Sequence, residues 1–190
     1  MTKVIITSSL LGLGLAMDAC AVSMANGLKE PKMKFKKQFI IALMFGLFQG
    51  LMPFAGYLVG SQFLTKIEWI IPWVALILLG YIGSNMLIGG IRNKDEEEDN
   101  TKDLTFKVLF VQAIATSIDA LSVGFSIADY SLLEAGICAS LIAFITFAIC
   151  VVAVTIGKKF GTKLGSKAEI LGGIILLAIG IEIFISGVFF

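Results

Sequence analysis

Apolar residues along this chain fall into six long stretches that are separated by short polar connections. Each stretch approaches or exceeds the roughly 20 residues that an α-helix needs to cross the hydrocarbon core of a bilayer. The pattern therefore predicts an all-α integral membrane protein with six transmembrane helices, near residues 4–28, 36–60, 69–91, 105–128, 132–157 and 168–190. Because little of the chain remains outside these spans, any activity must be carried by the spans and their connections.

Composition supports a membrane protein and excludes several other classes. Of the 190 residues, 57% are hydrophobic and only 15% are charged, whereas soluble domains are roughly 45 to 50% apolar. There is no nucleotide-binding loop motif. Cys20, Cys138 and Cys150 lie within predicted spans without metal-ligand spacing, so we interpret them as small buried apolar residues.

The basic residues predict an orientation. The connections 29–37, 92–107 and 158–167 hold five, four and four of the 15 lysines and arginines, while Lys3 and Lys66 are the other two. By the positive-inside rule, the three basic connections face the cytoplasm. Both termini are then extracytoplasmic, in a multi-pass protein of the plasma or inner membrane.

The sequence divides into two weakly similar halves. Residues 1–91 form a first three-helix repeat, residues 92–104 a polar cytoplasmic linker, and residues 105–190 a second three-helix repeat. Because three spans are an odd number, the second repeat enters the membrane from the opposite side, as in many secondary transporters. The matching phrases occur in one order: Asp18-Ala19 with Asp119-Ala120, Gly60 and Phe63 with Gly157 and Phe160, and Leu78-Leu79 and Gly83 with Leu176-Leu177 and Gly180.

Asp18 and Asp119 occupy matching places in the first and fourth spans. A carboxylate inside the membrane is costly unless a polar or charged group meets it, so such a residue marks a functional site by default. Carboxylates with amide, hydroxyl and backbone oxygens suit magnesium, calcium or manganese, whereas zinc and copper usually recruit histidine or cysteine. The chain has no histidine. We therefore predict that Asp18 and Asp119 bind one divalent cation, for which protons could compete.

Further polar residues could support this site. In the fourth span a polar stripe recurs at steps of three and four and is expected to face into the bundle; it consists of Gln112, Thr116, Asp119, Ser122 and Ser126. The candidates for neutral ligands or supporting contacts are Gln49, Asn85, Thr116 and Ser122. Glu182, which aligns with Asn85 in the repeat, either belongs to the pathway or reaches interfacial water.

Other features have simpler interpretations. The glycines of the second span, with Pro53, predict close helix packing and a kink. The acidic run 95–99 is a solvated loop or a means to concentrate cations near a cytoplasmic entrance. The basic clusters are explained by orientation and by anionic membrane lipid. These basic clusters need no nucleic-acid partner. Glycine-rich helix faces could pair two copies of the chain, so a homodimer is possible but is not predicted.

Specific phrases resemble the MntP-type manganese efflux pumps of bacteria along the whole chain. They are Ala16-Met17-Asp18-Ala19 with Val22-Ser23, Phe45-Gly46 with Gln49, Pro53 and Gly56, Ala113-Ile114-Ala115-Thr116-Ser117-Ile118-Asp119-Ala120, and Lys167-Ala168-Glu169-Ile170-Leu171-Gly172-Gly173. The resemblance implies a six-helix inner-membrane protein that exports manganese, with the family's paired aspartates at Asp18 and Asp119. The chain departs from the pattern at Gln49 and Gly89, where some members have glutamate, and this departure bears on metal preference.

Together these observations favour a secondary exporter of divalent cations, with manganese(II) as substrate, no cofactor and no enzymatic activity. Without a nucleotide motif, an ion gradient or the membrane potential would supply the driving force. The alternatives are a membrane scaffold that does not transport, a relative of the sporulation-associated proteins in this family, or an intramembrane aspartyl protease. Neither Asp18 nor Asp119 lies in the Gly-x-Gly-Asp phrase that such proteases share.

Overall fold

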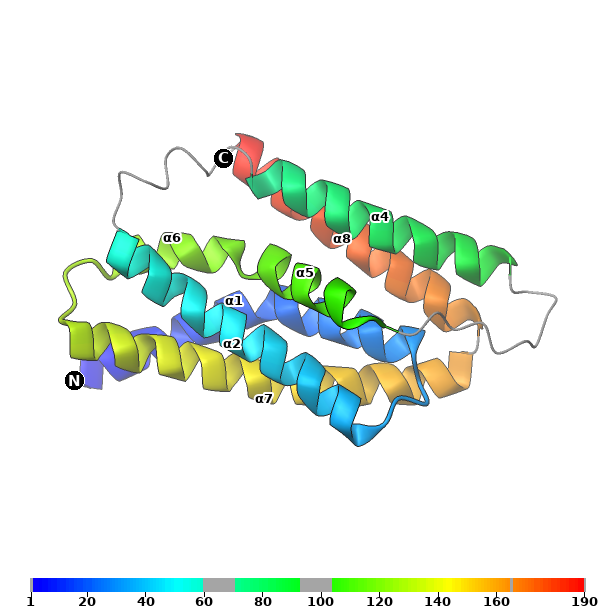
Figure 1. The fold of residues 1–190 in the computed structure, drawn as a ribbon, viewed down its shortest axis with the longest axis horizontal. Helices are drawn as coiled ribbons and strands as arrows, with labels where there is room; N and C mark the ends of the chain where they lie inside the picture. The colour runs from blue at the N-terminus through cyan, green and yellow to red at the C-terminus, as the bar shows by residue number, and fades with distance from the viewer. Residues whose placement is uncertain (1, 60–70, 93–103, 165, 190) are drawn as a thin grey trace.

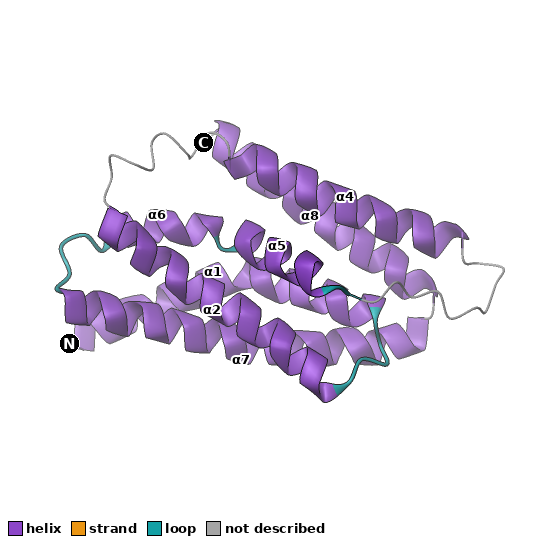
Figure 2. Ribbon diagram, in the orientation of Figure 1, coloured by secondary structure: helices purple, strands orange, loops and turns teal. Residues whose placement is uncertain are grey.

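The chain forms a bundle of helices, as the apolar pattern predicts. The structure is a computed structural model, which describes residues 2–59, 71–92, 104–164 and 166–189. Within these ranges there are seven α-helices and no strand (Figure 2). They are α1 (Thr2–Lys29), α2 (Phe35–Val59), α4 (Ile71–Arg92), α5 (Phe106–Thr116), α6 (Ile118–Ser126), α7 (Leu132–Leu164) and α8 (Ser166–Phe189).

The helices run back and forth along one long axis (Figure 1). Both termini lie toward the left end of Figure 1, and α1, α4 and α7 run from this end to the other. The helices α2 and α8, and the pair α5 and α6 taken together, run in the opposite direction. The α1–α2 connection therefore lies at the end opposite to the termini, and so do the end of α7 and the start of α8. These segments carry two of the predicted basic clusters.

Three of the described helices are long and apolar enough to cross a membrane: α1, α2 and α7. The pair α5 and α6 makes a fourth candidate if the two are one span bent by 40° at the short break between them. The helices α4 and α8 contain shorter apolar segments, Leu79–Ile91 and Ile170–Ile185. Each predicted span therefore coincides with helix, but the fourth is broken rather than continuous.

Glycines let three pairs of helices approach closely. A Cβ atom added at Gly27 of α1 would lie 2.5 Å from the carbonyl oxygen of Val154 in α7, and one added at Gly124 of α6 would lie 2.7 Å from the carbonyl carbon of Gly56 in α2. At Gly83 of α4 the added atom would lie 2.8 Å from a carbonyl oxygen of α8. Such contacts are typical of membrane helices, which associate through small residues because lipid gives them no hydrophobic reason to pair.

The second span behaves as its glycine pattern predicts. A Cβ atom at Gly46 would lie 2.8 Å from the carbonyl oxygen of Ala143, and one at Gly50 would lie 2.7 Å from that of Ala139, so both glycines pack against α7. Pro53 lies inside α2 without ending the helix. The interpretation of these glycines as packing residues is confirmed.

Large apolar side chains cover the outside of the bundle. Many are more than half exposed, and they come from every helix that the structure describes except α6; examples are Ile6, Leu10, Leu51, Tyr81, Phe106, Phe144 and Ile174. A soluble monomer rarely exposes large contiguous apolar patches. This surface fits hydrocarbon chains of lipid and supports the multi-pass membrane assignment.

At the basic end of the bundle, polar contacts fasten the α1–α2 connection. The Glu30 carboxylate accepts hydrogen bonds from Lys37 Nζ and, at 3.4 Å, from the backbone N–H of Leu104, just before α5. Lys158 of α7 donates to the carbonyl oxygen of Met33 at 2.8 Å. The acidic run 95–99 and most of the linker 92–104 lie outside the described residues.

We predict that the contact between α1 and α7 at Gly27 limits stability. Replacing Gly27 by alanine places a methyl group against the backbone of α7, and overpacking of this kind typically costs about 1 to 3 kcal/mol. Thermal unfolding of the purified protein in detergent should therefore begin at a lower temperature. Gly14→Ala is the matched control, because no atom lies within 4 Å of its added Cβ atom. Equal unfolding temperatures for the two variants would contradict this account of the interface.

Candidate metal-binding site

The centre of the candidate site is the break between α5 and α6. The helix α5 ends at Thr116, and Ser117 has φ −109° and ψ 4°, outside the α-helical range. Its backbone N–H bonds the carbonyl oxygen of Ile114 at 3.0 Å, while the Thr116 hydroxyl donates to the carbonyl oxygen of Gln112 at 3.0 Å. The first of these bonds satisfies the Ile114 carbonyl oxygen, which the break would otherwise leave without its usual helical partner. The second lies within the last turn of α5.

Asp119 lies in the first turn of α6, directly after the break. Its Oδ1 atom accepts a hydrogen bond from the backbone N–H of Ala120 at 2.8 Å. The free N–H groups at a helix N-terminus carry partial positive charge, so an acidic residue is favourable there. The break thus provides a polar environment for a carboxylate within an otherwise apolar span.

Gln49 of α2 connects the break to α1. Its side-chain nitrogen donates to the carbonyl oxygen of Leu15 at 3.1 Å, and its side-chain oxygen accepts a hydrogen bond from the Ser117 hydroxyl at 2.8 Å. Gln49 and Ser117 are both fully buried. The carboxamide therefore holds together three elements: the part of α1 that carries Asp18, the middle of α2, and the break next to Asp119.

The structure brings the carboxylates of three helices into one region. Asp18 and Asp119 lie close enough for their charges to act on each other, and Glu182 of α8 lies close enough to act on Asp18. Asp18 is partly exposed, and Asp119 and Glu182 are exposed. Within the described ranges, however, no three histidine, cysteine, aspartate or glutamate side chains are gathered tightly enough to hold a metal ion. A cation here would need further oxygen ligands.

The predicted polar stripe of the fourth span is only partly correct. Gln112 and Thr116 are buried, as expected, but Asp119, Ser122 and Ser126 are exposed. The prediction assumed one continuous helix, and the bend at Ser117 changes the direction of the second half. The stripe therefore faces the bundle in α5 and an open surface in α6.

Asn85 is exposed on α4. Nothing in the described part of the chain joins it to the aspartates by a hydrogen bond, so its role as a ligand stays a prediction. Thr116 is buried beside the break, and its hydroxyl already donates within its own helix. Of the neutral candidates, Gln49 has the most direct contacts with the elements that carry the aspartates.

A second buried amide contact was not predicted from the sequence. Asn26 Nδ2 donates to Gln112 Oε1 at 2.9 Å, and Gln112 Nε2 donates to Asn26 Oδ1 at 3.3 Å. Both side chains are 0% exposed. The pair joins α1 to α5 nearer the basic end than the aspartates. Each amide was visible in the sequence, but their pairing depends on how the two spans cross.

The interface of α1 with α7 contains buried hydroxyl groups without partners among the described residues, namely Ser8, Ser23 and Thr146. Cys138 and Cys150 are buried in α7 and are free thiols, in agreement with the interpretation of these two cysteines as packing residues. Cys20 of α1 is only partly buried, so the prediction that it is buried is wrong. These side chains are small, which allows α1 and α7 to lie close together.

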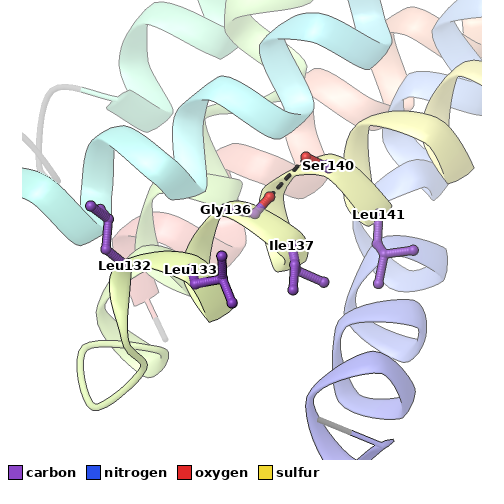
Figure 3. A pocket seen from close by; sticks show the side chains of 6 residues that line it. All are labelled: Leu132, Leu133, Gly136, Ile137, Ser140 and Leu141. Atoms are coloured by element: carbon purple, nitrogen blue, oxygen red, sulfur yellow. Dashed lines mark hydrogen bonds between the residues drawn. The ribbon is translucent and has the colours of Figure 1, made fainter.

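The pocket drawn in Figure 3 does not belong to this site. It lies on the outer surface at the start of α7, and its lining residues are Leu132, Leu133, Gly136, Ile137, Ser140 and Leu141. The Ser140 hydroxyl is used within its own helix, donating to the carbonyl oxygen of Gly136 at 2.8 Å. With no acidic group in its lining, this apolar hollow suits a lipid chain rather than a cation.

Comparison with known proteins identifies the family. Residues 32–184 match the family model described as "Putative manganese efflux pump". The chain belongs to this family. It is 44% identical to the "Putative manganese efflux pump MntP" of Ruminiclostridium cellulolyticum, over 95% of each chain, and 42% identical to the protein of that name from Rippkaea orientalis, over 96% of this chain and 97% of the relative. No solved structure matches the chain.

Membership confirms the resemblance that the aspartate phrases indicated. It also confirms the expectation that the chain is a transporter rather than an enzyme, because the family is described as a pump. A relative from Clostridium botulinum, "Putative manganese efflux pump MntP 2", is 42% identical over 95% of this chain and 94% of its own length. The relatives are matched almost from end to end, so the whole membrane domain is shared.

We predict that Gln49 and Ser117 stabilise the break as a unit. Gln49→Leu leaves the buried Ser117 hydroxyl without its acceptor, which should lower the free energy of unfolding by about 1 to 3 kcal/mol. Adding Ser117→Ala removes the stranded hydroxyl, so the double variant should be more stable than the sum of the single effects predicts. Denaturant unfolding of the four proteins in detergent measures this coupling. Strict additivity would show that the two side chains do not act together.

Proposed function

We propose that this protein is a secondary transporter that exports manganese(II) from the cytoplasm, with Asp18 and Asp119 binding the ion. The observation that carries the proposal is the proximity of these two carboxylates, from α1 and α6, beside a broken span in a chain of the manganese efflux family. Intramembrane carboxylates of this kind mark ion pathways. Broken spans next to a binding site are typical of secondary transporters.

The oxygen chemistry around the aspartates supports manganese or a similarly hard divalent cation. The chain has no histidine, and two of its three cysteines, Cys138 and Cys150, are buried in α7. Manganese accepts carboxylate, carbonyl and water ligands. Because both polar ends of the Gln49 side chain are already hydrogen-bonded, Gln49 acts by positioning α1 and the break, while Ser122 and Thr116 remain candidates for direct contact.

All six helical passes would be membrane spans, arranged as two inverted repeats: residues 1–91 and 105–190, joined by the linker 92–104. The direction of the helices in Figure 1 supports this arrangement, since each helix of the first half runs opposite to its counterpart in the second. The glycine contacts support it further: α1 meets α7 at Gly27, and their repeat partners α6 and α2 meet at Gly124.

In the proposed orientation, the basic end of the bundle faces the cytoplasm and both termini lie outside. The α1–α2 connection and the end of α7 carry lysines at one end of the bundle, and such clusters remain on the cytoplasmic side. Export then means that the ion enters from the basic end, reaches Asp18 and Asp119, and leaves toward the end with the termini. Coupling to protons and pairing into a homodimer stay predictions.

The proposed site predicts the effect of removing either charge. Asp18→Asn and Asp119→Asn keep the size of the side chain and one acceptor oxygen, but each removes one of the negative charges available to the cation. Even the loss of groups that only support metal ligands costs about 10- to 100-fold in affinity or activity, so export should fall by at least about tenfold. The measurement is the manganese content of cells that lack their own exporter and express each protein at the same membrane level.

The matched control is Asp129→Asn, because Asp129 is an exposed aspartate in the connection between α6 and α7. It should lower cell manganese as well as the native chain does. If native and Asp-to-Asn chains all lower manganese equally, the two aspartates are not the site. If neither the native chain nor any variant changes cell manganese, manganese is not the exported metal.

The orientation predicts which ends can be labelled from outside the cell. In a chain whose three cysteines are replaced by alanine, Lys3→Cys near the start of α1 should react with a membrane-impermeant thiol reagent in intact cells. Lys163→Cys near the end of α7 should react only after the membrane is permeabilised. Both lysines are exposed, so a reversed labelling pattern would show that the basic end faces outward.

A further inference from the structure

The helix α1 meets the broken span unevenly along its length. It contacts α5, on the basic side of the break, more than it contacts α6. The 40° bend at Ser117 directs α6 toward α2, where Gly124 and Gly56 are in close contact. The contacts that hold α1 to the broken span therefore lie mainly on the basic side of the aspartates.

Two layers of polar contact lie on this basic side. The first is the reciprocal amide pair of Asn26 and Gln112, whose side chains are both fully buried. The second lies one helical turn further toward the basic end, where the Glu30 carboxylate accepts the backbone N–H of Leu104. Leu109, 2% exposed, fills the space nearby. An ion coming from the basic end would have to pass these groups.

On the other side of the break, polar side chains are accessible. Asp119 and Ser122 of α6 are exposed, and so is Glu182 of α8, while Asp18 is partly exposed. No hydrogen bond joins α1 to α6 in the part of the chain that the structure describes. Because charged groups facing lipid are costly, this polar surface requires water rather than hydrocarbon. Asp119 and Ser122 are thus accessible on the side of the break that lies away from the amide pair.

We propose that the Asn26–Gln112 amide pair is the cytoplasmic gate of the transport pathway, and that the structure is its outward-open state. The proposal rests on the proposed export function for its direction. The pair separates when the cytoplasmic side opens, and the ion then reaches Asp18 and Asp119 past Gln112 and Thr116. A neutral amide pair suits this role, because each partner can exchange its hydrogen bonds for bonds with entering water without leaving a buried charge.

The test follows accessibility rather than transport. In the cysteine-free chain, Thr116→Cys lies on the aspartate side of the pair and should resist a polar thiol reagent applied to the cytoplasmic face of inside-out vesicles. Adding Asn26→Ala removes the pair and shifts the population toward the inward-open state. Loss of one Asn26–Gln112 hydrogen bond corresponds to a shift of about fivefold in the equilibrium between the outward-open and inward-open states. The labelling rate of Thr116→Cys should therefore rise about fivefold or more.

A second probe reports the opposite side. In the cysteine-free chain with native Asn26, Ser122→Cys should react with the same reagent applied from outside the cell. It should react more slowly once Asn26→Ala is added. Asp129→Cys, in the α6–α7 connection, should react equally in both backgrounds. The swapped variant Asn26→Gln with Gln112→Asn restores two facing amides and should return both probes toward the native rates, which a merely misfolded chain would not do.

Unchanged labelling of Thr116→Cys and Ser122→Cys in the Asn26→Ala background would overturn the gate. Labelling measures the gate without any manganese flux, so its result is independent of the export assay. If labelling shifts as expected in a chain that exports no manganese, the gate stands and the substrate assignment fails. If export is seen but labelling does not respond to Asn26→Ala, the export function stands and the gate fails.

Discussion

The fold depends on how the chain satisfies polar groups where the span from Phe106 to Ser126 is broken. Water is scarce inside a bilayer, so the protein itself must supply hydrogen-bond partners for a break of this kind. Gln49 of α2 accepts the hydrogen bond of the Ser117 hydroxyl at the break, and its amide nitrogen donates to the backbone of α1 at Leu15. One neutral side chain thereby connects three helices. Asp18 and Asp119 lie close in sequence to these two contacts.

Around this polar centre the helices are held by contacts of a different kind. The α1–α7 and α4–α8 interfaces bring backbones together at glycines such as Gly27 and Gly83, where even a methyl group would collide. Aromatic rings add to them, as where Trp73 of α4 meets Phe184 of α8 with ring centroids 4.7 Å apart. These tight pairs leave little freedom within each interface. Movement is easier where α1 faces the broken span, since the contacts there are sparse and polar.

Much of this architecture could be predicted from the sequence, because hydrophobic stretches of membrane length are strong signals. The helical spans and the packing role of the second-span glycines were expected, as was an electrostatic interaction between Asp18 and Asp119. The role of these two aspartates as metal ligands stays a prediction. The break at Ser117 was not expected, since the phrase Thr-Ser-Ile-Asp contains neither proline nor glycine and its polar residues keep helical spacing. The exposure of Ser122 and the pairing of Asn26 with Gln112 depend on the bend and on the crossing of two spans, which periodicity within one span cannot reveal.

The amide pair between α1 and α5 also bears on how the membrane potential acts. Voltage does work only on charge that moves through the field, about 2.3 kcal/mol for each elementary charge per 100 mV. Asn26 and Gln112 are uncharged, so separating or joining them moves no net charge. The carboxylates and any cation between them are the charges that the field can act on. In the proposed transport cycle, electrical sensitivity therefore resides in the loaded or empty site, and rearrangement of the amides alone is electrically silent.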